Sequence, residues 1–488
     1  MRYEPIDERC SCPAAIGGRP MNAVFDPVLM SAMTLDVIAS GLAAPEAITA
    51  HQQVRLTRLL EAALRGSRLY RERLRRVNPG VTPLRELPTV TRGELMARFD
   101  DWVTDPKLKL AELQEFMADP GRIGEAYLDK YVIWESSGSS HQPGVFVQDA
   151  TAMAVYDALE ALRRSVPRFL HRCFDPMFLA ERVAFVGATN GHFASVVSVQ
   201  RLRQLNPLMA KTVGCFSILR STATLVEELN TFAPTVIVTY PTAAALLADV
   251  AGRGLLRFKP MEIWTGGEKL SAAARQRVEL GLGCSVRNSY GASEFLSIGW
   301  ECARGRMHAN SDWVILEPVD ERGRPTPAGE PSNSTLLTNL ANHVQPLIRY
   351  DLGDRITMRR ERCDCGSHLP VIEVEGRCDD PLVMAGRGGQ AVTLLPLALT
   401  TVLEDVAGVF DFQLIQRDRH TLVLRLDLSG AQAETAVARC RAALKSFAAT
   451  QGLAPIRIVA ELGKPVSKGR SGKARRIVAG GKHKRQQS

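Results

Sequence analysis

One stretch of the chain is built from small hydroxyl-bearing residues and could bind a phosphate group. Between two apolar runs the sequence reads ESSGSSHQPG, which supplies clustered hydroxyls and backbone amides at Ser136, Ser137, Gly138, Ser139 and Ser140. Such groups can surround phosphate oxygens as an anion nest, because glycine lets the backbone approach closely. The stretch lacks the Gly-Lys-Ser/Thr of a Walker loop, so a serine-rich hairpin turn is the alternative interpretation.

Short motifs downstream could complete a nucleotide site. Five follow in order: WTGGEKL (264–270), NSYGASEF (288–295), PLIRYDLGD (346–354), GRCDDPLVMAG (376–386) and GRSGKARR (469–476). Together with the serine stretch, this series resembles the adenylate-forming superfamily of acyl- and aryl-CoA ligases, and within it the phenylacetate-CoA ligase-like branch. The resemblance covers roughly residues 90–480. Each motif is weak by itself, whereas the ordered series is specific.

The resemblance implies a reaction in which ATP activates a carboxylic acid. The acid would join the α-phosphorus of ATP as an acyl-AMP, pyrophosphate would leave, and a thiol would then take the acyl group. Lys473 matches the mobile lysine that neutralises charge during adenylation, a contribution on the order of 10² in rate. Lys464 and Lys468 are the rival candidates, and the spacing from Gly472 favours Lys473. Within the branch, the chain is similar to ligases that activate hydroxybenzoate-type acids.

Nucleotide contacts are implied for residues of the same motifs. Glu294 matches the position that ligates Mg²⁺, a hard cation that prefers oxygen ligands; a helix-capping glutamate is the alternative. Asp354 matches the aspartate that accepts hydrogen bonds from both ribose hydroxyls; a strand-end turn residue is the alternative. The other matched residues would surround the α-phosphate, adenine and ribose: Ser293, Asn288, Tyr290, Gly291, Gly266, Gly267, Glu268, Arg349 and Arg377.

The serine stretch departs from the family pattern at two positions. Relatives usually carry Gly and Lys where this chain has His141 and Gln142. The hydroxyls remain, but the point charge of the lysine is lost. Histidine has an ordinary pKa of ~6.5 and is mostly neutral at neutral pH, so it replaces that charge only when protonated. This departure puts pyrophosphate affinity and turnover in question.

The acyl group should bind where two apolar runs end in polar turns. The turn GATNGH contains Asn190 and His192 and leads to Phe193, and the turn YPT begins at Tyr240. In parallel α/β sheets, ligands lie beyond the carboxyl ends of the strands. We therefore expect Asn190, Phe193 and Tyr240 to contact the substrate, and His192 to act as a catalytic donor to its carboxylate. Packing in the core is the alternative for these side chains.

Four residues have the chemistry of a metal site. Cys302 and His308 form a C-x5-H pair, and Cys363 and Cys365 form a C-x-C pair about 55 residues further on. Three thiolates and one imidazole suit tetrahedral zinc, and both pairs lie in turn-rich segments. His368 is a competing ligand, and reduced structural thiols are the alternative.

The elements that position these residues are typical of an α/β protein. Apolar runs at 183–189, 235–240 and 261–268 alternate with helical segments, which predicts parallel β-α-β units. Short antiparallel strands are expected from about residue 312, followed after about residue 377 by two helices and three strands. The spacing of leucines predicts an amphipathic helix over residues 46–76.

Several domains are expected, because 488 residues exceed the ~250 to 300 at which a single core stops growing. The resemblance implies the adenylate-forming enzyme fold, with a large N-terminal α/β domain and a smaller mobile C-terminal α+β domain. We expect a flexible extension over residues 1–35, a nucleotide- and acyl-binding domain over 36–377, and a mobile domain with a basic tail over 378–488. Rotation of the C-terminal domain about Asp379 would move Lys473 out of the active site and bring in a channel for the thiol.

The basic excess of the chain lies at its end. The formal net charge is +9, and residues 464–488 contain nine basic and no acidic residues, so the remainder is neutral. This excludes the broad basic surface of a nucleic-acid-binding protein. No stretch reaches the ~20 consecutive apolar residues of a membrane span, and the N-terminus lacks a signal-peptide pattern. We expect a cytoplasmic protein whose ten cysteines are mostly reduced or bound to metal.

These patterns predict an AMP-forming acid–thiol ligase that uses ATP and Mg²⁺ to activate an aromatic carboxylic acid. The acceptor would be coenzyme A or the phosphopantetheine of an acyl carrier protein, and the chain would act as a monomer or homodimer. Two alternatives share the nucleotide motifs. One is a degenerate adenylate-binding protein without turnover, and the other is an enzyme that transfers AMP to a cofactor hydroxyl.

Overall fold

The computed structural model describes residues 24–136, 143–163, 181–375, 381–409, 412–428, 430–463 and 476–480. Several predictions lie outside these residues. They concern Ser137, Gly138, Ser139, Ser140, His141, Gln142, Arg377, Asp379 and Lys473.

The largest sheet has nine strands in the order β13-β14-β9-β8-β7-β6-β5-β3-β4. From β4 to β7 neighbouring strands are parallel, and from β7 to β13 they are antiparallel. The parallel half confirms the predicted β-α-β units. Its strands are β3 (Val183–Gly187), β4 (Val213–Ser217), β5 (Val236–Thr239), β6 (Glu262–Thr265) and β7 (Ser285–Ala292). The antiparallel half consists of β8 (Phe295–Glu301), β9 (Met307–Ala309), β13 (Arg355–Met358) and β14 (Val371–Glu375).

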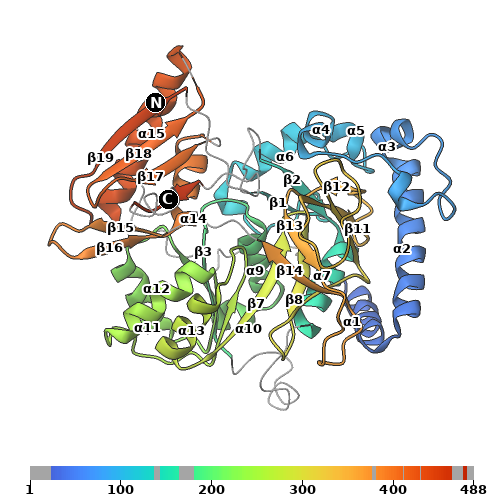
Figure 1. Ribbon diagram of the computed structural model, residues 1–488, viewed down its shortest axis with the longest axis horizontal. Coiled ribbons are helices and arrows are strands. Elements are labelled where there is room, and N and C mark those ends of the chain that lie inside the picture. Colours follow the sequence, from blue (N-terminus) through green and yellow to red (C-terminus); the bar gives the residue numbers. More distant parts are fainter. Residues whose placement is uncertain are drawn as a thin grey trace.

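Helices connect the parallel strands, and Figure 1 shows them in green beside this half of the sheet. Serine caps begin two of them, because the hydroxyls of Ser221 and Ser271 accept hydrogen bonds from backbone amides in the first turns. The connecting helices are α9 (Ala194–Leu205), α10 (Pro207–Thr212), α11 (Thr222–Phe232), α12 (Pro241–Gly252) and α13 (Ala272–Leu282).

The N-terminal part is helical. The predicted helix over 46–76 is present but divided, because Ser67 has extended backbone angles and its side chain caps a new helix at the amide of Tyr70. Gly66 is needed at the break, since a Cβ there would lie 2.5 Å from Thr104. The elements are α1 (Pro27–Leu42), α2 (Pro45–Gly66), α3 (Arg68–Arg73), η1 (Leu84–Glu86), α4 (Arg92–Ala97), α5 (Phe99–Trp102), α6 (Leu110–Met117) and η2 (Pro120–Arg122).

The predicted flexible extension over 1–35 is wrong for its last residues. Helix α1 starts at Pro27, and the Asp26 carboxylate caps it by accepting hydrogen bonds from two amides. Val24 and Val37 are buried in the same hydrophobic core as α2. The sequence signal was present, since Asp-Pro before an apolar segment is a helix start.

Two small antiparallel sheets flank the central one. Strands β1 (Val132–Glu135) and β2 (Val145–Gln148) form a hairpin, and the serine stretch connects them. Helix α7 (Ala150–Leu162) follows β2. The second sheet contains β10 (Val314–Val319), β11 (Ser334–Asn339) and β12 (Tyr350–Asp351), as predicted for the region after residue 312.

The C-terminal residues form sheets of their own, in orange and red in Figure 1. A four-stranded sheet has the order β19-β18-β17-β20, and a hairpin pairs β15 with β16. The two predicted helices and three predicted strands are present; β15, β16 and β20 were not predicted. The elements are β15 (Leu382–Ala385), β16 (Ala391–Leu394), α14 (Pro396–Thr401), the π-helical turn η3 (Val402–Val406), β17 (Gln413–Gln416), β18 (Thr421–Leu426), α15 (Gly430–Thr450), β19 (Arg457–Leu462) and β20 (Ile477–Val478).

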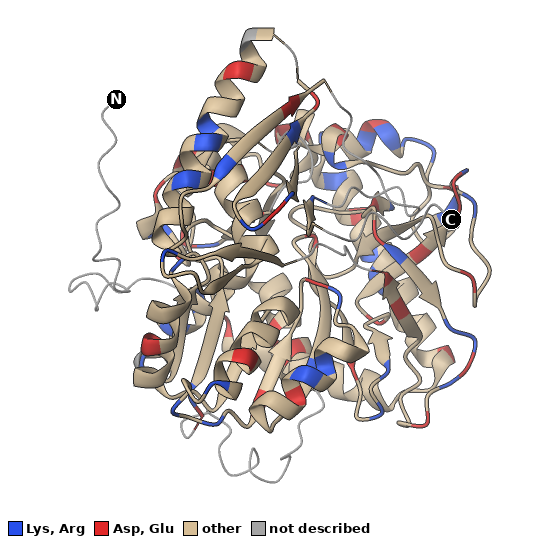
Figure 2. Ribbon diagram, turned by 60° about the vertical axis from the view of Figure 1, so that its left-hand side comes forward, with Lys and Arg blue, Asp and Glu red and all other residues tan. Residues whose placement is uncertain are grey.

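Two hydrophobic cores stabilise the molecule. One joins the N-terminal helices, β1, β2, α7 and the antiparallel strands, and the other joins the parallel strands, their helices and the C-terminal elements. Figure 2 shows acidic and basic residues interspersed over the described ribbon. Among the described residues, no helix combines the length and apolarity that crossing a membrane requires.

Candidate active site

Glu294 is buried in the turn between β7 and β8, and residues from two distant segments hold its carboxylate. The Tyr350 hydroxyl donates to Glu294 Oε1 at 2.6 Å, and Arg92 Nη2 lies 3.3 Å from the same oxygen. Arg92 Nε also donates to the Tyr350 hydroxyl at 3.3 Å. Burial and the neighbouring Glu294 raise the pKa of Tyr350 well above its ordinary value, so the hydroxyl stays a donor. We name Glu294, Tyr350 and Arg92 the Glu294 cluster.

The hairpin of β1 and β2 lies against this cluster. Trp134 in β1 donates its indole N–H to the carbonyl of Ser293 at 2.8 Å. Two residues later, Ser136 is paired with Gly144 just beyond the ends of the two strands. The Ser136 amide donates to the Gly144 carbonyl at 2.8 Å, and Ser136 Oγ accepts from the Gly144 amide at 2.9 Å. The described base of the predicted phosphate loop therefore lies beside the predicted magnesium ligand.

A second carboxylate is held nearby. The Tyr290 hydroxyl donates to Asp354 Oδ2 at 2.8 Å. Burial, and next the charge of Asp354, raise the pKa of Tyr290 well above its ordinary value. A register shift between Tyr290 and Ala292 brings Gly291 so close to the next strand that a Cβ there would meet the Leu296 carbonyl oxygen at 2.0 Å. The position requires glycine, in agreement with the motif YGASE.

The predicted adenine-side residues meet at the ends of β5, β6 and β7. Asn288 Oδ1 accepts a hydrogen bond from Thr265 Oγ1 at 3.0 Å. Gly267 has a φ of +76°, and a Cβ there would lie 3.1 Å from the Tyr240 ring. Gly266 is equally confined, since its Cβ would lie 2.9 Å from the Ser289 hydroxyl. The structure thus places Gly266, Gly267, Asn288 and Tyr240 close together, near the carboxyl ends of the inner strands β5 and β6.

Glu268 binds the N-terminus of helix α12. Its carboxylate accepts hydrogen bonds from the amide and the hydroxyl of Thr242, both at 3.1 Å, in the first turn of α12. Glutamate at a helix N-terminus is stabilised by the unpaired amides there. Burial, and next the Glu268 charge, raise the pKa of Tyr240 to about 12.

The predicted acyl-side residues lie next to β1. The Glu135 amide donates to the His192 carbonyl at 2.8 Å, and Glu135 forms a parallel bridge with Phe193. The His192 ring is buried near Phe116, with ring centroids 5.9 Å apart, and burial lowers its pKa, so the imidazole is neutral. Backbone groups of Met117 and Arg122 lie near the ring, but neither ring nitrogen has a hydrogen-bond partner of normal geometry within the described part of the chain. The catalytic role of His192 stays a prediction.

The C-terminal elements reach the same region through Asp405 in η3. Asn190 Nδ2 donates to Asp405 Oδ2 at 3.1 Å. Desolvation, and next the carboxylates of Glu135 and Glu404, raise the pKa of Asp405 to about 7. Arg476 Nη1 pairs with Glu404 at 2.6 Å, and both side chains are buried. Arg476 lies three residues beyond Lys473, so this pair anchors the described residues that follow the predicted catalytic lysine.

Arg349 is bound by protein groups. Its Nε donates to Glu317 at 3.0 Å, and its Nη1 donates to the carbonyls of Arg85 and Leu87. Its backbone has a φ of 51°, in the left-handed region. Support of the ribose and phosphate by Arg349 stays a prediction.

The sequence did not identify four residues of this region: Arg92, Tyr350, Glu135 and Asp405. Tyr350 lies inside the motif RYDLGD and could have been considered with its neighbours. Arg92 is 202 residues from Glu294, and nothing in the spacing relates the two. Glu135 is the first residue of the stretch ESSGSSHQPG but was given no role, Asp405 was outside the motifs, and only the fold brings the two together.

The Cys/His cluster, defined as Cys302, His308, Cys363 and Cys365, is assembled as predicted from spacing. The four ligand atoms all lie within 4.8 Å of one another. His368 is exposed and outside the group.

Comparisons with known proteins identify the fold. A 2-hydroxyisobutyryl-CoA ligase in complex with 2-HIB-AMP and CoA matches with a TM-score of 0.56 and 18% identity, over 90% of this chain and 91% of that one. The same ligase in its postadenylation state matches with a TM-score of 0.52 and 19% identity, over 91% of each chain. This chain has the adenylate-forming fold.

A sequence relative agrees with this fold. The chain is 32% identical over 207 residues to a phenylacetate-coenzyme A ligase of Thermus thermophilus, and the match spans 40% of this chain and 44% of that relative. No protein-family model matches. The chain therefore spans less than half the length of this relative, whose name agrees with the branch that the sequence motifs resemble.

The donors present in this fold fit a magnesium–nucleotide complex. Glu294 offers a buried carboxylate, Asp354 a second one, and Ser136 a hydroxyl at the base of the serine hairpin. Oxygen donors of this kind are those that Mg²⁺ and ribose hydroxyls require.

Proposed function

We propose that the protein is an AMP-forming acid–thiol ligase. An oxygen of the acid substrate would attack the α-phosphorus of ATP, the bond to the β-phosphate would break, and pyrophosphate would leave. The thiolate sulfur of coenzyme A would then attack the acyl carbon, and AMP would leave with the oxygen that had joined it. The thiol proton would go to solvent.

The Glu294 cluster carries this proposal. The buried Glu294 carboxylate lies 2.6 Å from the Tyr350 hydroxyl and 3.3 Å from the Arg92 guanidinium. When Mg²⁺ binds, it would replace Arg92 as the cation next to this carboxylate. The Tyr290–Asp354 pair beside it offers the acceptor that a ribose needs. The names of the fold relatives, which include an acyl-AMP and CoA, support the same chemistry.

Mg²⁺ would be held by Glu294 and would neutralise phosphate charge as pyrophosphate departs. The chain's own residues would do the remaining work. Tyr350 orients the carboxylate, Asp354 would accept from the ribose, and Gly291 lets the strands approach. Lys473 would contribute positive charge at the α-phosphate, and the Arg476–Glu404 pair supports its placement by fixing the chain that follows.

The finer identity of substrate and acceptor is part of the proposal. The relative named for phenylacetate favours an aromatic acid, such as a hydroxybenzoate, bound near Phe193, Asn190 and Tyr240. Coenzyme A is the preferred acceptor, and a carrier-protein phosphopantetheine is the alternative. We further propose that the enzyme works in the cytoplasm, where its cysteines would be reduced or bound to metal, as a monomer or homodimer.

Pyrophosphate release tests the proposal. The full-length protein is incubated with ATP, Mg²⁺ and a panel of aryl and short hydroxy acids, with and without coenzyme A. We expect release that depends on one acid, and a thioester when coenzyme A is present. If no acid gives release while the protein still binds an acyl-AMP analogue, the protein is a degenerate adenylate-binding protein.

Lys473→Ala tests the role taken from the family. We expect pyrophosphate release to fall on the order of 10² or more, because the developing charge loses its cation. Lys464→Ala, which removes a lysine earlier in the same basic segment, is the control. Equal rates for Lys473→Ala and the wild-type protein would refute the assignment.

A further inference from the structure

The Cys/His cluster joins two turns that are distant in the sequence. Cys302 directly follows β8, His308 lies in β9, and Cys363 and Cys365 lie in the loop between β13 and β14. Cys302 Sγ and Cys363 Sγ are 3.8 Å apart, and Cys365 Sγ is 3.3 Å from His308 Nε2. Cys302 and His308 are buried, and the other two are partly buried.

These distances match those of a tetrahedral zinc site. Zinc–sulfur bonds of ~2.3 Å and zinc–nitrogen bonds of ~2.0 Å at tetrahedral angles separate two sulfurs by about 3.8 Å, and a sulfur and a nitrogen by about 3.5 Å. The corresponding separations here are 3.8 Å and 3.3 Å. A disulfide requires a sulfur–sulfur distance of ~2.0 Å and would leave Cys365 and His308 unused.

The imidazole is oriented as a metal ligand. His308 Nδ1 lies 2.8 Å from the carbonyl oxygen of Leu369 and donates to it, which leaves the lone pair of Nε2 directed at the cluster. The ring stacks on Trp300, with centroids 5.2 Å apart and 22° between the planes. The loop that supplies this carbonyl is fixed in turn, because the Leu369 amide donates to Ser367 Oγ at 3.3 Å.

The turns present their cysteines through tight backbone bonds. The Cys302 amide donates to the Arg306 carbonyl at 2.9 Å, and Gly305 in this turn has a φ of +71°. Gly366 directly follows Cys365 with a φ of +86°. Positive φ at these two positions explains the glycines and lets each ligand pair face inward.

We propose that Cys302, His308, Cys363 and Cys365 bind one zinc ion that fastens the β8–β9 turn to the β13–β14 loop. Four protein ligands leave no open position, so the site is structural. The two segments need such a fastening, because β9 and β14 pair through only two residue pairs, His308 with Val371 and Met307 with Ile372.

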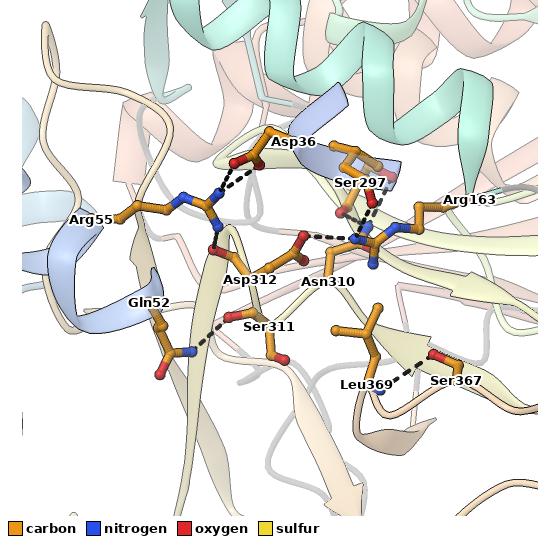
Figure 3. Close-up of polar contacts among 11 residues, drawn as sticks. Asp36, Gln52, Arg55, Arg163, Ser297, Asn310, Ser311, Asp312, Ser367 and Leu369 are labelled. Atoms are coloured by element: carbon orange, nitrogen blue, oxygen red, sulfur yellow. Dashed lines mark hydrogen bonds and ion pairs between the residues drawn. The ribbon is translucent and has the colours of Figure 1, made fainter. Parts of the chain in front are cut away.

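The zinc would also steady a buried polar network that begins two residues after His308. Figure 3 shows how Asn310, Ser311 and Asp312 hold helices α1, α2 and α7. Arg163 of the region after α7 pairs with Asp312 at 2.6 Å. On the other side, Arg55 of α2 donates to the Asp312 carbonyl at 2.6 Å and pairs with Asp36 of α1 at 2.5 Å. The segment that carries His308 is therefore the one onto which the N-terminal helices dock.

Metal analysis of tag-free protein tests the proposal without any substitution. We expect about one zinc per chain after extensive dialysis against metal-free buffer, released in step with modification of three thiols by an organomercurial. Cobalt exchanged into the site should give the charge-transfer and ligand-field bands of a tetrahedral, thiolate-rich centre. Protein with native absorbance and activity but less than about a tenth of a zinc per chain would overturn the proposal.

Two variants separate the cluster from other thiols. Cys363→Ser should lower the zinc content at least about tenfold relative to the wild-type protein. Cys284→Ser, which removes a thiol outside the cluster, should keep all of it. If Cys363→Ser does not fold, Cys365→His offers a ligand of another type and should retain the metal with an altered cobalt spectrum. Equal zinc in all variants, or a mass lower by two hydrogens for a Cys302–Cys363 disulfide, would contradict the proposal.

Discussion

The Cys/His cluster and the Glu294 cluster differ in where their parts come from. The Cys/His cluster consists of two short pairs, and all four side chains were identified from their spacing. The Glu294 cluster draws Tyr350 and Arg92 from segments 56 and 202 residues away. All four ligands of the proposed zinc ion come from these two pairs, whereas the Glu294 carboxylate is held by residues that no shared motif connects to it. A site whose donors share a motif is visible in the sequence, and a site assembled across the fold is only partly so.

If the Glu294 cluster is catalytic, Glu294→Gln should have the largest effect on activity. The amide keeps the size of the side chain and can still accept from Tyr350, but it removes the charge that would bind Mg²⁺. We expect kcat/KM for pyrophosphate release to fall by about 10² to 10³, with a change in unfolding free energy below ~1 kcal/mol. Glu373→Gln, which removes an exposed carboxylate paired with Arg359, is the control and should keep activity within about threefold.

Zinc removal should give the opposite pattern. Chelation with a thiol reductant present should lower the free energy of unfolding by about 2 to 4 kcal/mol, since the two turns lose their link. The rate of pyrophosphate release at low temperature should change less than about twofold. Denaturant unfolding and the release assay on the same sample measure both quantities. If zinc removal caused a large loss of activity and left the free energy of unfolding unchanged, the Cys/His cluster would have a catalytic and not a structural role.

Arg92 tests whether the Glu294 cluster exchanges cations when ATP binds. Once a metal occupies the carboxylate, the guanidinium should pair with phosphate and replace part of the charge missing at Gln142. We expect Arg92→Ala to raise KM for ATP about tenfold, a loss of ~1.4 kcal/mol, and Arg92→Lys to restore part of it. Arg73→Ala, which breaks a half-exposed pair with Glu94, is the matched control. An unchanged KM would assign Arg92 to packing alone.

Asp405 should give the smallest effect, visible as a dependence on pH. Its carboxyl binds a proton more tightly in the folded state, with a pKa of about 7 against 3.8 ordinarily, so stability should fall as pH rises from about 4 to about 7. Asp405→Asn should therefore be more stable than the wild-type protein at pH 8. The difference should be less than ~1 kcal/mol, because neighbouring groups desolvate the carboxyl but solvent still reaches the residue and screens its charge, and it should vanish near pH 4. Melting temperatures over this range measure it, with Asp427→Asn as control. Parallel curves would contradict the assignment.

Much of the fold followed from the sequence because its signals are local. The apolar runs that became β3, β5 and β6 alternate with helical segments, and that alternation alone predicts parallel pairing. Strands β15 and β16 were not predicted, because the short hairpin that they form beside GRGG has no long apolar run. The division of the predicted helix at Gly66 depends on Thr104, which no local pattern reveals.

The residues of the candidate site that could be predicted are those that lie in a recognisable motif. Glu294, Asp354 and Gly291 were named from their motifs, and the structure places them near Tyr350, Tyr290 and Leu296. The role of Arg349 stays a prediction, since the structure shows its side chain bound to Glu317, Arg85 and Leu87, which no local pattern reveals. Asp405 was missed because its neighbours Asn190 and Glu135 come from other parts of the chain.

The left-handed backbone of Arg349 has a mechanical consequence. Such a conformation costs a non-glycine residue about 1 to 2 kcal/mol, and the bonds of its side chain to Glu317, Arg85 and Leu87 offset that cost. The next residue is Tyr350, whose hydroxyl aims the Glu294 carboxylate. The bonds that hold Arg349 therefore also hold the position of Tyr350, so the direction of the Glu294 carboxylate is set by the protein itself before any ligand binds.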